Sequence, residues 1–375
     1  MRRWWGLLLA VVLFLGIGGC GGDQSTHKAA PVVERPLSSQ PAGKDYRVGP
    51  DNNRLHVHFI DVGQGDSILV LTPDGEAMLV DGGDGDHGQM VVDYLRAQGV
   101  KQLAVLVATH PHADHIGGLE KVLANYKVKR VYMPRVTNNT DQFAGLLDEI
   151  KAQGLKINTA GAGVNIPLSG VQAVFVAPGR QAYENINDYS AVLRITYGKV
   201  AFLLAGDAGE VSENEMLAAG MDLRADVLKV GHHGSHSSTG EDFLQAVAPR
   251  YAVIMCGLGN DYGHPHWETL ESLSEAGVRV YRSDLSGNIV ITCDGDKIDV
   301  KTEGKGAASG GAAAAETTSG QSATDSGGGY IGNRHSHKFH RPTCSSLPQA
   351  SNQVFFNSRE EAVQSDYSPC GRCRP

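Results

Sequence analysis

The chain has 375 residues, more than one hydrophobic core usually holds, so one large domain with smaller additions or two medium domains are expected. The formal net charge of −8 excludes a strongly basic surface that would wrap nucleic acid through phosphate attraction alone. Any activity on nucleic acid must therefore depend on metal ions and local patches.

The N-terminal segment, residues 1–20, has the features of a targeting signal. Arg2 and Arg3 precede an apolar run from Trp4 to Ile17, which is shorter than the ~20 residues of a membrane-spanning helix. The end of the run, Ile17-Gly18-Gly19-Cys20, resembles the lipobox of bacterial lipoproteins, in which the cysteine is lipidated and becomes the mature N-terminus. A cleaved signal peptide and an uncleaved anchor are the alternatives. All three place the chain outside the cytosol, anchored to the cell membrane or secreted.

Two segments of low complexity divide the rest of the chain. Residues 21–53 are rich in Gly, Pro, Ser and charge, which predicts a flexible tether. Residues 304–329 are almost entirely Gly, Ala, Ser and Thr, and such a segment cannot bury enough apolar surface to fold. We therefore expect a body at residues 54–303 and a small tail at residues 330–375, joined by a linker.

Strand-like and helix-like segments alternate through the body. Apolar alternation predicts strands at residues 55–61, 67–72, 77–80, 171–176, 189–197 and 200–205. A helix is expected at residues 89–98, followed by a buried strand at residues 103–108. Two similar α/β halves predict two sheets packed face to face with helices outside, a four-layer αββα sandwich. Periodicity alone leaves a doubly wound sheet as the alternative.

A cluster of histidines and an aspartate directly follows the predicted strand 103–108. His110 and His112 alternate on extended backbone, so both imidazoles leave on one side, and Asp114 and His115 approach the same space from the next turn. Imidazole and carboxylate suit zinc, manganese or iron, and four such groups in six residues exceed what one ion normally takes from one loop. The spacing therefore predicts two divalent ions, with a His-rich surface loop as the alternative.

This HxHxDH motif resembles that of the metallo-β-lactamase superfamily, where it supplies ligands to both metals of a hydrolase site. Further stretches are similar to the ComEC/Rec2 branch of competence-protein hydrolases: residues 58–67, 187–190, 202–207, 230–235 and 263–266. The resemblance covers residues 55–303 and implies the αββα fold, two zinc or manganese ions, and a phosphodiesterase or nuclease related to DNA uptake. DNA is the substrate that it implies.

The resemblance also implies a ligand set. Asp207 is the only charge at the end of an apolar strand, and a carboxylate has the two oxygens needed to bridge two cations. With Asp207 shared, the implied ligands are His110, His112 and His233 for one ion and Asp114, His115 and His264 for the other. The residues themselves support only the set. The groups expected to take part in catalysis are Asp114, Asp207, His233 and His264.

Spacing does not decide between neighbouring histidines. His233 is preferred over His232, and His264 over His266, which leaves His232 to support the site or to donate to a substrate oxygen. Better-known members of the superfamily have a ligand histidine before the bridging aspartate, whereas residues 116–206 contain no histidine. The missing ligand is therefore expected from the second half.

Other polar residues are expected to support the site or contact the substrate. Asp81 resembles the carboxylate that holds the metal loop through hydrogen bonds, with a simple Asp-Gly turn as the alternative. Asn187 and Ser190 are candidates to orient substrate or water. Ser235 offers a hydroxyl to a substrate oxygen.

The substrate remains open in two ways. The same site could act on another ester, such as a teichoic-acid-type phosphoester, a lactam or a thioester. Alternatively the chain is a surface metal-binding module without turnover. The sequence indicates no protein partner.

The tail carries four zinc-type ligands in two pairs, His340 with Cys344 and Cys370 with Cys373. A segment of this length makes a poor core, so a structural zinc is expected to close a small α+β module, with a disulfide as the alternative. The tail resembles the Ada-type metal-binding domain, which uses four cysteines, and His340 stands where that family has its methyl-accepting cysteine. Methyl transfer is therefore not expected. Six basic residues favour a role in presenting DNA: Arg334, Lys338, Arg341, Arg359, Arg372 and Arg374.

Overall fold

The computed structural model describes the body over residues 53–180 and 182–304. In the tail it describes residues 329–342, 344, 346–349, 352–356, 359–365 and 367–373. The predicted signal and the lipidation predicted at Cys20 lie outside the described residues, as do the predicted tether apart from residue 53 and the predicted linker apart from residues 304 and 329. No helix among the described residues combines the length and the apolar character needed to cross a membrane.

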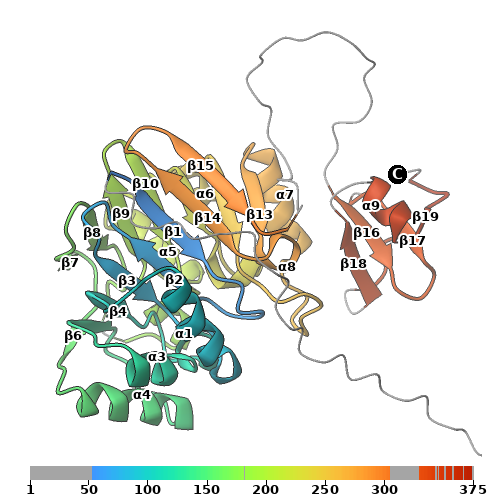
Figure 1. The fold of residues 1–375 in the computed structure, drawn as a ribbon. Coiled ribbons are helices and arrows are strands. Elements are labelled where there is room, and N and C mark those ends of the chain that lie inside the picture. The colour runs from blue at the N-terminus through green and yellow to red at the C-terminus, as the bar shows by residue number, and fades with distance from the viewer. Residues whose placement is uncertain are drawn as a thin grey trace, which may run out of the picture. The chain divides into compact units, whose positions relative to one another are not determined.

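The body is built on two sheets (Figure 1). The first has the order β15-β14-β1-β2-β3-β4-β5-β6. Its strands are β1 Leu55–Phe59, β2 Ile68–Leu71, β3 Ala77–Val80, β4 Val105–Val107, β5 Val131–Met133, β6 Ile157–Thr159, β14 Ile289–Cys293 and β15 Ile298–Thr302. The second has the order β13-β12-β11-β10-β9-β8-β7. Its strands are β7 Asn165–Ile166, β8 Gln172–Phe175, β9 Leu193–Tyr197, β10 Val200–Leu204, β11 Val227–Lys229, β12 Tyr251–Ile254 and β13 Arg279–Arg282.

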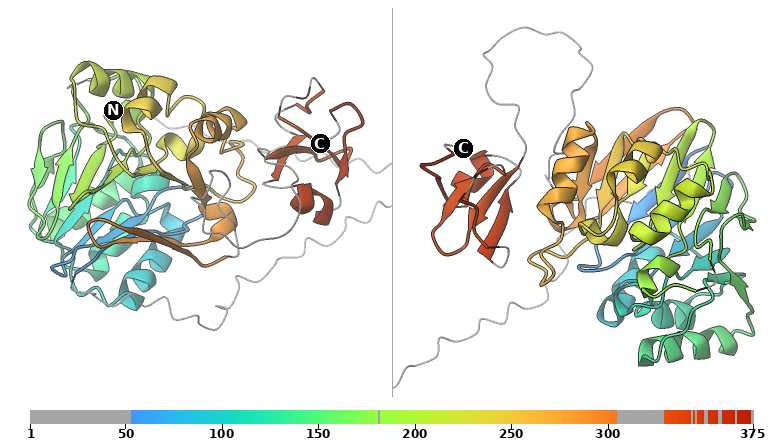
Figure 2. Two further views of the ribbon diagram at one scale, coloured as in Figure 1. Left: turned by 90° about the horizontal axis from the view of Figure 1, so that it is seen from above. Right: turned by 180° about the vertical axis from the view of Figure 1, so that it is seen from behind.

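Helices cover the outer face of each sheet (Figure 2). The first sheet packs against α1 Gly88–Ala97, α3 Leu119–Asn125 and α4 Asp141–Ala152. The second packs against α5 Glu210–Ala218, α6 Glu241–Val247 and α7 Trp267–Glu275. Five short helical segments lie in the connections: η1 Gly85–His87, α2 Ala113–Ile116, η2 Ile186–Tyr189, η3 Gly231–Gly234 and α8 Ser283–Ser286.

Alternate side chains of a strand enter different cores, because successive residues point to opposite faces of a sheet. Phe202 and Leu204 of β10 lie in the core between the two sheets, whereas Leu203 packs with the helices outside. Both faces of the central strands are therefore apolar. The predicted four-layer αββα sandwich is confirmed, and the doubly wound sheet was wrong because the strands form two sheets rather than one.

One predicted strand begins later than expected. The alternation suggested a strand from residue 189, but Ile186–Tyr189 forms the 3-10 turn η2, and β9 starts at Leu193. The Asn185 side chain accepts a hydrogen bond from Asn187 N at 3.0 Å and caps this turn. A local side-chain cap therefore overrides the strand pattern at this point.

The tail forms a four-stranded sheet in the order β18-β16-β17-β19. Its elements are β16 Tyr330–Asn333, β17 Lys338–His340, β18 Gln353–Phe356, α9 Arg359–Gln364 and β19 Ser368–Pro369. Its buried apolar cluster comprises Tyr330, Phe339, Phe356 and Ala362. So small a core favours a further source of stability.

Candidate metal centre

The first part of the site is the loop that joins β4 to α2. His110 is buried on this loop and His115 is buried in α2 directly after it, and Asp81, the residue after β3, holds both segments. Asp81 accepts from Thr109 N at 2.8 Å, from Thr109 Oγ1 at 2.6 Å and from His115 Nδ1 at 2.8 Å. Because His115 donates to Asp81 through Nδ1, its other ring nitrogen, Nε2, faces the interior of the site.

The second part is Asp207, in the turn after β10. Asp207 is 2% exposed, and its backbone N donates to Ser190 Oγ at 3.0 Å. Its Oδ1 lies 3.3 Å from His115 Nε2. Its Oδ2 lies 3.5 Å from His233 Nε2 and 3.7 Å from His110 Nε2. One carboxylate thus faces imidazoles of the first loop and of the second half.

The third part is the turn η3, which carries two adjacent histidines. His232 and His233 both have left-handed backbone, with φ of 46° and 55°, a conformation that costs energy for residues other than glycine. His233 Nδ1 donates to Met255 O at 2.9 Å, which directs Nε2 toward Asp114 Oδ2 at 3.2 Å. His232 Nε2 lies 3.9 Å from Asp207 Oδ2, on the more open side. The two rings therefore diverge, and the inner one is His233.

These side chains form two groups that share Asp207. Asp114, His115, Asp207 and His233 offer ligand atoms within 4.8 Å of one another, and so do His110, His112 and Asp207. This grouping differs from the predicted partition, which placed His233 with His110 and His112. The reason is the bond from His233 Nδ1 to Met255 O, which turns the opposite nitrogen to Asp114.

His264 is not brought into either group. Its ring centroid lies 5.4 Å from that of His232 and 6.2 Å from that of His233, on the rim of the site. His266 lies farther along the same rim, with its Nδ1 2.8 Å from His236 Nδ1. The geometry therefore gives His264 no place among the converging ligand atoms.

The donor set fits divalent cations. His115 Nε2 and Asp207 Oδ1 are fully buried and have no hydrogen-bond partner, although they lie 3.3 Å apart. Unpaired buried polar atoms are costly, and a cation between them would satisfy both. Nitrogen and carboxylate oxygen are ligands that zinc and manganese accept.

The charges of the site agree with cation binding. Burial alone would raise the pKa of Asp207, but the neighbouring His115 and His233 hold it well below its usual range. Burial lowers the pKa of His233, but Asp207, Asp114 and Asp66 outweigh it and raise that pKa to about 9. Protons on His115 and His233 thus compensate the carboxylates. A divalent ion supplies the same positive charge and displaces these protons.

Sequence reasoning missed a buried ion pair beneath the site. Lys229 at the end of β11 has no exposed surface, and its Nζ lies 2.7 Å from Asp66 Oδ2. Asp66 Oδ1 in turn lies 3.4 Å from His233 Nδ1. A lysine that ends an otherwise apolar strand was the available signal. Gly65 sits beside this pair with φ of 135°, and a Cβ there would lie 2.2 Å from Asp114 O. Glycine is therefore required for this loop to approach the metal loop.

The remaining predicted residues surround the cluster. Ser190 Oγ lies 3.4 Å from His110 Nδ1, so it contacts a ligand histidine as well as Asp207. Asn187 Nδ2 lies 3.4 Å from His232 Nε2. Ser235 Oγ lies 3.0 Å from Ser237 Oγ, so its hydroxyl is engaged within its own loop.

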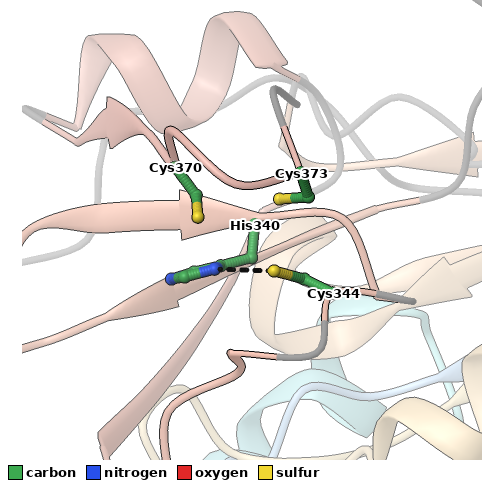
Figure 3. Close-up of side chains that lie close together, drawn as sticks. All are labelled: His340, Cys344, Cys370 and Cys373. Atoms are coloured by element: carbon green, nitrogen blue, oxygen red, sulfur yellow. Dashed lines mark hydrogen bonds between the residues drawn. The ribbon is translucent and has the colours of Figure 1, made fainter.

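The tail brings its four predicted ligands together (Figure 3). His340 Nδ1 lies 3.4 Å from Cys344 Sγ, and all four ligand atoms lie within 4.8 Å of one another. The cysteines Cys344, Cys370 and Cys373 are free, so they do not form the alternative disulfide. The backbone N–H groups of Cys373 and Arg372 lower the pKa of the Cys370 thiol to about 7, which favours the thiolate that zinc binds.

Comparison with known proteins agrees with the fold of the body and with the predicted nature of the tail. Residues 60–258 match the Metallo-beta-lactamase superfamily, and residues 320–375 match the metal binding domain of Ada. The chain therefore belongs to the metallo-β-lactamase superfamily of metal-dependent hydrolases.

Three curated relatives place the body in the ComEC/Rec2 competence-protein branch. ComE operon protein 3 of Bacillus subtilis is 33% identical over 62% of this chain and 32% of its own length. Competence protein ComA of Neisseria gonorrhoeae is 31% identical over 63% of this chain and 32% of its own. Recombination protein 2 of Haemophilus influenzae is 28% identical over 65% of this chain and 30% of its own length. The chain thus spans about a third of the length of these relatives.

Proposed function

We propose that the body is a phosphodiesterase that uses two divalent ions, zinc or manganese, to cleave nucleic acid, with DNA as the expected substrate. The observation that carries this proposal is the convergence of two separate segments, residues 110–115 and the turn η3, on Asp207, whose two oxygens face different imidazoles. A purely structural site would need one ion, closed on all sides. Here each group has one half-buried ligand, Asp114 in one and His112 in the other, so neither is closed on all sides.

Each residue has a distinct task in this proposal. Asp207 would be shared by both ions, with His110 and His112 on one side and Asp114, His115 and His233 on the other. When bound, the ions supply Lewis acidity and a water of lowered pKa. Asp81 fixes the tautomer of His115, and the Met255 carbonyl fixes that of His233. His232 faces Asp207 from the more open side and is placed to donate to a substrate oxygen.

The choice of a phosphodiester rests on the relatives. Two of these relatives are named as a competence protein and a recombination protein, and recombination acts on DNA. The net charge of −8 fits a site in which metal ions, rather than many basic side chains, neutralise the phosphate.

The test combines metal content with turnover. Metal-loaded protein is incubated with single-stranded DNA, a chromogenic phosphodiester and a chromogenic lactam, and bound metal is measured by elemental analysis. We expect Asp207→Asn to lower phosphodiester hydrolysis by more than about 100-fold, because loss of mere ligand-supporting groups already costs 10–100-fold. Bound metal should fall as well.

The matched control is Asp148→Asn, which removes an exposed carboxylate from α4. This variant should keep both metal and activity. Hydrolysis of the lactam without hydrolysis of either phosphodiester would contradict the proposed substrate class. Full activity in Asp207→Asn would contradict the site.

We also propose that the chain works outside the cytosol, held at the membrane by lipid on Cys20, and that the tail binds one structural zinc. The supporting observations are the Ile17-Gly18-Gly19-Cys20 sequence and the four converging tail ligands. Metabolic labelling with a fatty-acid analogue tests the anchor, since Cys20→Ala should abolish the label.

The basic tail is proposed to present DNA, so deletion of residues 330–375 should weaken DNA binding.

A further inference from the structure

The loop between β12 and α7 exposes two large side chains beside the metal centre. Leu258 is 80% exposed and Tyr262 is 67% exposed. Single exposed aliphatic residues are common on surfaces, but an exposed aromatic ring at the rim of a site has an apolar face that a ligand can cover. Tyr262 is therefore a candidate for contact with a ligand.

Side-chain hydrogen bonds brace the loop on both sides of Tyr262. Asn260 Nδ2 donates to Gly257 O at 2.9 Å and to His264 O at 2.6 Å, and Asn260 Oδ1 accepts from His264 N at 3.0 Å. Gly257 N donates to Gln64 Oε1 at 3.1 Å, which ties the loop to the first half of the body. A ring displayed on so constrained a loop loses little conformational entropy when it binds.

A series of ring contacts, the first stacked and the second edge-on, leads from Tyr262 to the metal centre. The Tyr262 ring stacks on His264 with an interplanar angle of 19° and centroids 5.6 Å apart. The His264 ring lies 5.4 Å from that of His232, and His232 Nε2 lies 3.9 Å from Asp207 Oδ2. His264 covers one face of the tyrosine, and the large exposed fraction leaves the other face open. The His264 ring thus stands between Tyr262 and the ligand His233, whose ring centroid lies 6.2 Å from that of His264.

Two charged residues near the site do not attract a substrate phosphate, so an aromatic ring would add to the binding energy of a substrate. Lys229, the lysine beneath the cluster, is fully buried and paired with Asp66, so it cannot contact a substrate phosphate. Asp261, next to Tyr262, is exposed and acidic. Stacking of a base on an aromatic ring does not depend on phosphate attraction and tolerates any sequence.

We propose that Tyr262 is the stacking platform for one unpaired nucleobase of a single-stranded nucleic acid whose phosphodiester lies at the metal centre. The inference rests on the proposed phosphodiesterase function and specifies that its substrate is single-stranded. A base within a duplex is already stacked on its neighbours, so the platform favours single strands over duplexes. His264 then acts as the support behind the ring rather than as a metal ligand.

The experiment compares substrates that differ only in their bases. Manganese-loaded full-length protein is given a single-stranded DNA oligonucleotide, the same length of fully abasic oligonucleotide, and the corresponding duplex. Tyr262→Ala should lower kcat/KM for the base-bearing single strand by about 5- to 100-fold, mainly through KM. Cleavage of the abasic strand should not change, and Tyr262→Phe should behave as wild type.

Binding provides a second readout that needs no turnover. Fluorescence anisotropy with a labelled single strand, without added divalent ion, should show weaker binding for Tyr262→Ala and unchanged binding for the control Leu258→Ala. Equal losses on the base-bearing and abasic strands, or none on either, would overturn the platform while leaving the phosphodiesterase intact. Failure of the wild type to cleave any of the three substrates would instead overturn the proposed function, and the platform with it.

Discussion

Lys229 is a fully buried cation whose only carboxylate within ion-pair distance, among the described residues, is Asp66. Its Nζ also donates to Val230 O at 2.9 Å, so the ammonium is held from more than one side. Removing one partner of such a pair leaves an uncompensated buried charge, which is far more costly than removing both. The pair joins the loop before β2 to the end of β11, one segment from each half of the body.

We expect Lys229→Met to lower the free energy of unfolding by about 3–5 kcal/mol, because the Asp66 carboxylate stays buried without its partner. The double variant Asp66→Asn/Lys229→Met should recover much of that loss. Urea unfolding followed by circular dichroism measures both. Lys199→Met is the matched control, since Lys199 pairs with Asp296 on the surface and its removal should change stability little. A double variant no more stable than Lys229→Met would show that the pair does not act as a unit.

Among the elements, α5 supports the loop that carries the ligand His233. Glu213 on α5 accepts from Thr239 N, at 2.5 Å, and from Gly240 N, at 3.0 Å. Thr239 Oγ1 in turn accepts from Gly231 N at 3.1 Å. One buried carboxylate thus holds the end of the η3 loop at the start of α6.

Glu213 makes stability depend on pH. Burial, with help from Glu210 and Asp188, raises its pKa from 4.5 to about 7 despite the two N–H donors. The folded protein therefore binds this proton more tightly than the unfolded chain. The resulting contribution is fully present below pH 4.5 and is lost as the pH rises through about 7, by an amount on the order of 2–3 kcal/mol.

Thermal unfolding of wild type and Glu213→Gln between pH 5 and 8 measures this contribution. The difference in stability between the two proteins should change across this range, in favour of the variant at high pH, and level off above about pH 7.5. Glu241→Gln, on the exposed first turn of α6, should follow the wild-type curve. Parallel curves for wild type and Glu213→Gln would contradict the assignment.

The elements also show where sequence reasoning succeeds and fails. Strands such as β4 and β10 were predictable because a short continuous apolar run records burial on both faces of a strand. The HxHxDH loop was predictable because its ligands are adjacent in the sequence. Lys229 pairs with Asp66, and His233 with Asp114, only because the fold brings distant segments of the chain into contact. No local pattern encodes those contacts, so the ligand set was predictable and its grouping was not.

For the molecule as a whole, the body and the tail use different means of stabilisation. The body has three large apolar clusters, whereas the tail has one cluster of four buried residues. The ligands differ as well, imidazole and carboxylate in the body but mainly thiolate in the tail. The tail should therefore depend on its metal for folding, while the body should not.

Cys370→Ala tests this difference in the full-length protein. We expect bound zinc to fall by one ion per chain and amide hydrogen exchange to become fast in residues 330–373, because the tail loses a thiolate ligand and its core is too small to fold alone. The thermal transition of the body should not shift, since its three apolar clusters contain no tail residue. Cys293→Ala, which removes a buried thiol from the body, should leave both zinc and tail protection unchanged. Slow exchange in the tail of zinc-depleted Cys370→Ala would show that the module folds without its metal.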